Sequence, residues 1–136
     1  MKFIGLMVPT IMAGVLLGCA AGEITTSAKP FDGAGLDATN WQLTAATSGP
    51  LSTLQAATEI TLQFKDGFVY GNAGCNRYQA PYQVEKGRLI IDRIGMTKML
   101  CHGEKGQVEN AFVAFLEGTS TLLKADSALL LESNNA

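Results

Sequence analysis

The chain has 136 residues, of which ten are Lys or Arg and twelve are Asp or Glu, so its formal net charge is −2. This length suits one domain and is too short for two comfortable ones. Because the balance is slightly acidic and no cluster of Lys and Arg occurs, we expect no nucleic-acid partner.

The N-terminus has the layout of a secretory signal peptide. One cation, Lys2, precedes an almost uninterrupted apolar run from Phe3 to Leu17, and Pro9 weakens any continuous helix. Fifteen helical residues span about 22 Å, whereas a transmembrane helix must cross a hydrocarbon core of roughly 30 Å. We therefore expect residues 1–18 to direct export and to be removed.

The residues around position 19 predict which kind of signal this is. Leu16-Leu17-Gly18-Cys19 resembles the lipobox of bacterial lipoproteins, in which the cysteine is acylated and the chain is cut just before it. The resemblance implies a membrane anchor of acyl chains, such as palmitate, on Cys19. Residue 20 is Ala rather than Asp, which in a Gram-negative bacterium favours the outer membrane with the domain facing the periplasm. The alternative is an ordinary signal peptide that leaves Cys19 as a free thiol.

The next segment predicts a spacer between the anchor and the folded part. Residues 19–38 are rich in Ala, Gly, Thr and Ser, and Pro30, Gly33 and Gly35 interrupt any period. We therefore expect a flexible tether over 19–38 and a single, monomeric domain over 39–136.

The rest of the chain predicts a small antiparallel sheet. Apolar residues alternate with polar ones in short runs, and Asp66-Gly67 and Lys86-Gly87 are typical hairpin turns. A further turn is expected at Asp126-Ser127. The expected strands are residues 41–45, 60–64, 68–70, 82–84, 88–91, 121–124 and 128–131.

One amphipathic helix is expected between Glu104 and Glu117. Its apolar face comprises Val108, Ala111, Phe112, Phe115 and Leu116. The same periodicity places Glu109 and Asn110 off that face, and Gly118 is a suitable C-terminal stop. Strands joined by tight turns, with one late helix, predict an α+β fold in which the helix covers a sheet that curls toward a barrel.

Two cysteines, Cys75 and Cys101, remain after Cys19. An even pair in an oxidising compartment is first interpreted as a disulfide. The alternatives are two reduced thiols packed as small apolar groups, or a redox or metal site that includes the adjacent His102. A zinc site would lack a fourth soft ligand, so we expect no metal and no cofactor.

Four motifs in order resemble the META domain family, which includes the HslJ-like heat-shock-inducible proteins. They are Trp41-Gln42-Leu43, Gly71 to Tyr78 with its Gly-Cys-Asn core, Thr97-Lys98-Met99-Leu100-Cys101, and the closing helix and strand pair. The resemblance spans about residues 40–131. It implies a compact α+β domain of the bacterial envelope that is linked to stress or antibiotic tolerance. It supplies no catalytic residue, because the family has no established active site.

The Gly-Cys-Asn segment is the candidate binding region. Gly71 to Asn76 suits a bend with positive φ or a β-bulge, and no Lys-Ser/Thr follows that would make it a phosphate loop. Tyrosines cluster near this bend and could face a partner, although strand aromatics more often pack within a sheet. The candidate surface residues are Asn72, Asn76, Arg77, Tyr78 and Tyr82.

These patterns predict a non-enzymatic envelope lipoprotein that binds another envelope component. No Gly-x-Ser-x-Gly elbow occurs, and the single histidine has no evident orienting acid. Two other hypotheses stay open: a thiol-redox or metal-binding protein that uses Cys75, Cys101 and His102, and an inhibitor of a hydrolase.

Overall fold

The computed structural model describes residues 2–6, 28–46, 51–54, 59–125 and 127–133. The predicted lipid site Cys19, most of the predicted tether and the expected turn residue Asp126 lie outside these ranges. The helices and strands are β1 (Lys2–Leu6), β2 (Lys29–Pro30), β3 (Thr39–Ala46), α1 (Leu51–Leu54), β4 (Thr61–Lys65), β5 (Phe68–Asn72), β6 (Arg77–Glu85), β7 (Arg88–Ile91), β8 (Gly95–Met96), α2 (Glu104–Leu116), β9 (Gly118–Ala125) and β10 (Ala128–Ser133).

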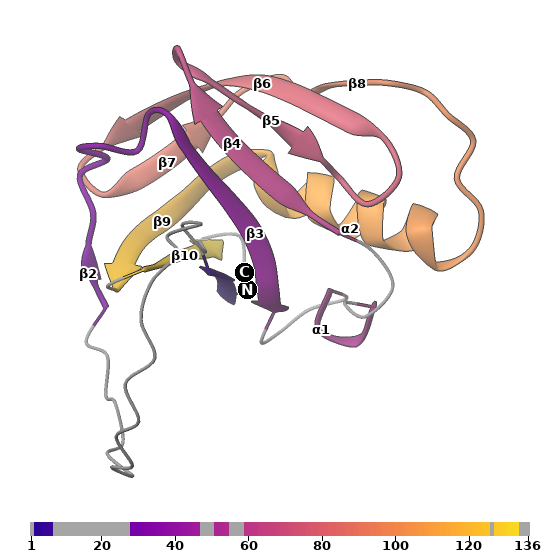
Figure 1. The fold of residues 1–136 in the computed structure, drawn as a ribbon, viewed down its shortest axis with the longest axis horizontal. Helices are drawn as coiled ribbons and strands as arrows, with labels where there is room; N and C mark the ends of the chain where they lie inside the picture. The colour runs from indigo at the N-terminus through magenta and orange to yellow at the C-terminus, as the bar shows by residue number, and fades with distance from the viewer. Residues whose placement is uncertain (1, 7–27, 47–50, 55–58, 126, 134–136) are drawn as a thin grey trace, which may run out of the picture.

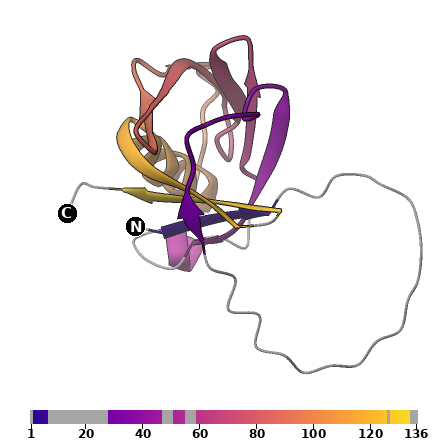
Figure 2. The ribbon, with the colours of Figure 1, turned by 90° about the vertical axis from the view of Figure 1, so that its left-hand side faces the viewer.

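The strands form one antiparallel sheet that curls round on itself (Figures 1 and 2). Neighbouring strands follow in the order β10, β1, β3, β4, β5, β6, β7 and β9, and β9 also pairs with β10, so the pairings return to their start. The short strand β2 adds to β9, and β8 adds to β6. The predicted fold class is thereby confirmed: α+β, with a curled, barrel-like sheet and one long helix near the C-terminus.

The two expected hairpin turns have the geometry that their sequences favour. Asp66 and Gly67 have φ of 53° and 79°, and Lys86 and Gly87 have φ of 50° and 73°. Positive φ at both central residues matches the right-handed twist of the flanking strands, and Gly and Asp tolerate it at low cost. These turns fix the registers of β4 with β5 and of β6 with β7.

The core lies inside the curl, and α2 lies across one end of it (Figure 1). In β4, Leu62 and Phe64 are buried and alternate with more exposed residues, as expected for a strand with one face toward the core and the other toward solvent. The helix contributes Phe112, whose ring makes an edge contact with Tyr78 of β6 at 5.5 Å between centroids. None of the described helices is long and apolar enough to cross a membrane.

Ordered structure begins earlier than the predicted boundary at residue 39. Lys29 and Pro30 pair with β9, the Phe31 N–H donates to the carbonyl of Leu122, and the Leu36 side chain is fully buried. The prediction of a tether through residue 38 was therefore wrong for its last part. Its Gly and Pro content suggested a spacer, but Pro30 occupies an edge strand, where proline is tolerated, and the burial of Leu36 anchors the segment.

The full-length chain also places part of the predicted leader in the sheet. Strand β1, residues Lys2–Leu6, lies between β3 and β10 and pairs with both. Sequence analysis had excluded this segment from the fold because it was expected to be removed. That residues 1–18 are cleaved off during export stays a prediction.

Gly71 of β5 lies close against the backbone of Thr61 in β4. A Cβ atom on this residue would lie 2.2 Å from the carbonyl oxygen of Thr61 and 2.7 Å from its Oγ1. The same Thr61 atoms accept hydrogen bonds from the Tyr78 hydroxyl, at 2.7 Å, and from the Asn72 N–H, at 3.0 Å. Glycine is therefore required here by space rather than by a positive φ.

We expect Gly71→Ala to destabilise the domain by about 2 kcal/mol, because the added methyl group must displace backbone at Thr61. Urea denaturation measures the loss as a lower midpoint. The matched control is Gly95→Ala, whose new Cβ would meet only the Gln79 carbonyl oxygen at 3.6 Å. Its effect should stay within about 0.5 kcal/mol, and equal losses in the two variants would contradict the packing argument.

Candidate functional site

A disulfide joins the two motifs that sequence analysis singled out. Cys75 lies in the turn between β5 and β6, and Cys101 lies in the segment between β8 and α2. Their Cα atoms are 6.2 Å apart across a sequence separation of 26 residues. The first interpretation of the pair is thus confirmed. In the chain-entropy model, closing a loop of this length stabilises the folded state by about 3.5 kcal/mol.

Next to the disulfide, the side chain of Asn76 connects three segments. Its Oδ1 accepts from the Met99 N–H at 2.7 Å and from the Thr97 hydroxyl at 3.0 Å. Its Nδ2 donates to Glu109 Oε1 at 2.9 Å and to the Met99 carbonyl at 3.2 Å. The Asn76 backbone N–H donates to the other Glu109 oxygen. The amide therefore ties the turn before β6 to the loop that follows β8 and to α2.

Glu109 is buried, which corrects the helical prediction. Helix periodicity placed it off the apolar face, yet only 9% of it is exposed, and Asn76 is 4% exposed. A buried carboxylate is costly unless hydrogen bonds satisfy it, and both of its oxygens accept from Asn76. The partner lies 33 residues away, so no local pattern could have indicated it.

The loop after β8 is fixed along its backbone while its tip faces solvent. The Arg77 N–H donates to Thr97 Oγ1 at 3.1 Å, and the Thr97 N–H donates to the Arg77 carbonyl at 3.0 Å. Beyond Thr97, the Met99 and Leu100 side chains are 60% and 82% exposed. The disulfide and Asn76 hold this apolar tip in place, so its exposure does not reflect a loose loop.

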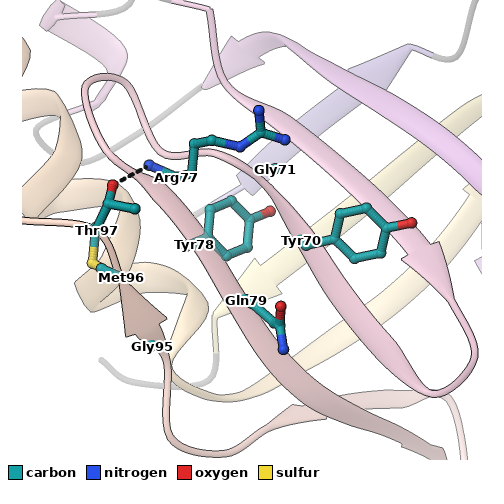
Figure 3. Close-up of a pocket in the computed structure, with 8 residues that line it drawn as sticks. All are labelled: Tyr70, Gly71, Arg77, Tyr78, Gln79, Gly95, Met96 and Thr97. Carbon is teal, nitrogen blue, oxygen red and sulfur yellow. Dashed lines mark hydrogen bonds between the residues drawn. The ribbon is translucent and has the colours of Figure 1, made fainter.

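An open groove of about 460 Å³ lies on the outer face of β5, β6 and β8 (Figure 3). Tyr70 and Gln79 are cross-strand partners, and on the other side of Gln79 lies Gly95, which has no side chain. The groove lies where Gly95 has no side chain to fill the space beside Gln79. Arg77 and Met96 line its end, and Arg77 brings a positive charge to it.

The predicted surface residues divide between this groove and the interior. Arg77 lines the groove and is exposed. Asn76 is the buried junction, and Asn72 Oδ1 accepts the Gly74 N–H at 2.8 Å within the turn. Tyr82 lies elsewhere, with its ring 4.9 Å from that of Phe64 and beside a second hollow. Tyr70, one of the tyrosines near the bend that could face a partner, does line the groove. Sequence analysis missed Gln79 and Met96, which only the strand register brings beside it.

Tyr78 lies under the groove with its ring in the core. Only 3% of it is exposed, and burial raises the pKa of its phenol above the usual value. The group therefore stays a neutral donor to Thr61 at any physiological pH. The pKa of Tyr82 is also raised, by burial and by the charge of Asp37.

The structure bears on the redox and metal alternative as well. The Sγ atoms of Cys75 and Cys101 and a carboxylate oxygen of Glu109 all lie within 4.8 Å of one another. Both sulfurs are spent in the disulfide, whereas soft metals need thiolates. His102 is exposed and is not part of this group of potential ligands, so the structure does not bring together the three residues that the alternative invoked.

We expect Asn76→Ala to destabilise the domain by about 3 kcal/mol, because it leaves the Glu109 carboxylate buried and short of a donor. Chemical denaturation under non-reducing conditions measures this loss while the disulfide stays intact. Asn40→Ala, at an exposed position of β3, is the matched control and should change stability by less than about 0.5 kcal/mol. An equally small change at Asn76 would show that its amide does not support the junction.

Comparison with known proteins agrees with this architecture. A solved structure described as "NMR structure of the protein from Burkholderia xenovorans" matches with a TM-score of 0.54 and 22% identity, over 95% of this chain and 100% of that one. At this identity the likeness concerns the fold alone. A search of curated proteins finds no match. The model of the META domain family matches residues 34–136, which include both cysteine motifs, the groove and α2. The chain therefore belongs to the META domain family.

Proposed function

We propose that this protein is a non-enzymatic lipoprotein of the bacterial cell envelope, and that it binds another envelope component at the groove of Tyr70, Arg77, Gln79 and Met96. The observation that carries the proposal is the way this groove is held. Both Arg77 and Thr97 belong to segments that Asn76 and the disulfide fasten to the domain. A recognition surface that is ordered before binding loses less conformational entropy when its partner arrives.

The chemistry of the groove suits recognition. Arg77 offers a guanidinium that pairs with carboxylate or phosphate groups, and Gln79 is both donor and acceptor. Tyr70 adds an aromatic surface of the kind that is enriched where proteins meet. The two cysteines beside the groove, Cys75 and Cys101, are tied together in the disulfide and offer no free thiolate. We therefore assign binding rather than catalysis to this site.

The proposed location rests on the N-terminal sequence. Leu16-Leu17-Gly18-Cys19 supports acylation at Cys19, and Ala20 supports sorting to the outer membrane with the domain in the periplasm. The disulfide fits such an oxidising compartment. We propose further that the bound component is one that the cell protects during envelope stress, since the META resemblance implies stress or antibiotic tolerance.

Metabolic labelling tests the anchor. We expect radioactive palmitate to label the full-length protein, and we expect Cys19→Ser to abolish that label because the acylated sulfur is gone. A variant with both Cys75→Ser and Cys101→Ser is the matched control and should keep it. Mass spectrometry of the purified product should place the N-terminus at residue 19. An unmodified sulfur at Cys19 would disprove the anchor.

Crosslinked capture from native envelopes tests the groove. We expect Arg77→Glu to reduce recovery of the partner at least roughly tenfold, because it reverses the charge that the groove presents. Arg88→Glu is the matched control: it makes the same charge change at another exposed strand position outside the groove, and it should leave recovery unchanged. Equal recovery with both variants would remove the groove as the binding site.

A further inference from the structure

Strand β1 closes the curled sheet, yet it comes from the segment that export is proposed to remove. Residues Phe3–Leu6 pair with four residues of β3 on one side, and all of Lys2–Leu6 pair with Ala128–Glu132 of β10 on the other. The four partners in β3 are Gln42, Leu43, Ala45 and Ala46. Both pairings are antiparallel, so β3 and β10 run parallel to each other. Figure 2 shows β1 (indigo) lying beside the yellow β10 at the lower part of the domain.

Removal of the leader would leave a gap one strand wide. Neighbouring strands are about 4.8 Å apart, so strands on either side of a missing one stand about 9.6 Å apart. Backbone N–H and C=O groups on both facing edges would then lose their partners. Direct pairing of β3 with β10 would have to be parallel and would require the sheet to contract by a full strand.

The β10 edge lacks the usual protection against pairing with another chain, whereas the pairing of β3 with β1 has a register shift between Ile4 and Gly5. Exposed edge strands are normally blunted by Lys, Pro or bulges. Residues 42–46 read Gln-Leu-Thr-Ala-Ala, and residues 128–132 read Ala-Leu-Leu-Leu-Glu, with a single charge at the very end. The register of β10 with β1 is continuous over its whole length. An edge such as that of β10 is typical of a strand that receives a partner.

We propose that in the mature lipoprotein the gap between β3 and β10 is a receptor for an extended peptide segment of another protein. The proposal rests on the removal of residues 1–18 in the proposed function, and it is a second surface, separate from the Arg77 groove. The occupant is a mostly apolar strand of about five residues that runs antiparallel to both edges, as Lys2–Leu6 does in the full-length chain. Main-chain hydrogen bonds on both sides provide its affinity.

The test uses mature lipoprotein purified in detergent from cells that express the full-length chain. Mass spectrometry first establishes that the leader is absent. The probe is a synthetic peptide of residues 1–7, and the readout is amide hydrogen exchange at those N–H groups of Gln42–Ala46 and Ala128–Glu132 that face the gap. The other amides of β10 pair with β9, and the Leu43 N–H donates to the Ile60 carbonyl, so these amides serve as internal references. We expect the amides that face the gap to exchange rapidly alone and at least roughly tenfold more slowly with peptide. A control peptide with Ile4→Pro and Gly5→Pro loses two N–H donors and should give no protection.

Each result bears on the proposal. Protection by the native peptide alone supports it. Edge amides that are already protected without peptide would overturn it, either because β3 and β10 pair directly or, where protection rises with protein concentration, because a second copy fills the gap. Unchanged exchange with peptide would overturn it too. An intact leader in the purified protein would instead refute the processing that the proposed function requires, so the two failures can be told apart.

Discussion

The side-chain amide of Asn76, buried beside a disulfide, holds together segments that are far apart in the sequence. Its oxygen and nitrogen satisfy the loop at Thr97 and Met99, and its two N–H donors, from the side chain and from the backbone, satisfy Glu109 of α2. A buried carboxylate without such donors would cost several kcal/mol. Because the helix, the loop and the turn share one set of hydrogen bonds, none of them can shift alone.

The hydrogen bonds of Asn76 also hold the outer surface around the groove in one arrangement. Loops that carry binding residues are usually among the less stable parts of a protein. Here the loop between β8 and α2 is fixed at Thr97 by Arg77, at Met99 by Asn76 and at Cys101 by Cys75. The groove beside it and the exposed Met99 and Leu100 therefore keep one arrangement. A surface of this kind suits a protein whose role is to bind.

The strands away from the groove are arranged by a different requirement, which is to close the curled sheet. The groove lies on β5, β6 and β8, whereas β1 completes the circuit between β3 and β10. Hydrogen bonding makes a missing strand costly in a sheet, because two edges open at once. A chain that loses β1 on maturation must either contract or accept another strand, and the parallel course of β3 and β10 disfavours simple contraction.

The sequence by itself determined the features that depend on near neighbours. Asp66-Gly67 and Lys86-Gly87 predicted their hairpins because positive φ is a local property. The alternation at Leu62 and Phe64 indicated which face of β4 is buried and which faces solvent. The META motifs were also evident, and the even pair of cysteines favoured a disulfide over its alternatives. Only the tertiary structure decided the burial of Glu109, the short strands β2 and β8, and the meeting of Tyr70, Gln79 and Gly95 in one groove. Each of these depends on a partner distant along the chain, and neither periodicity nor turn chemistry contains that information.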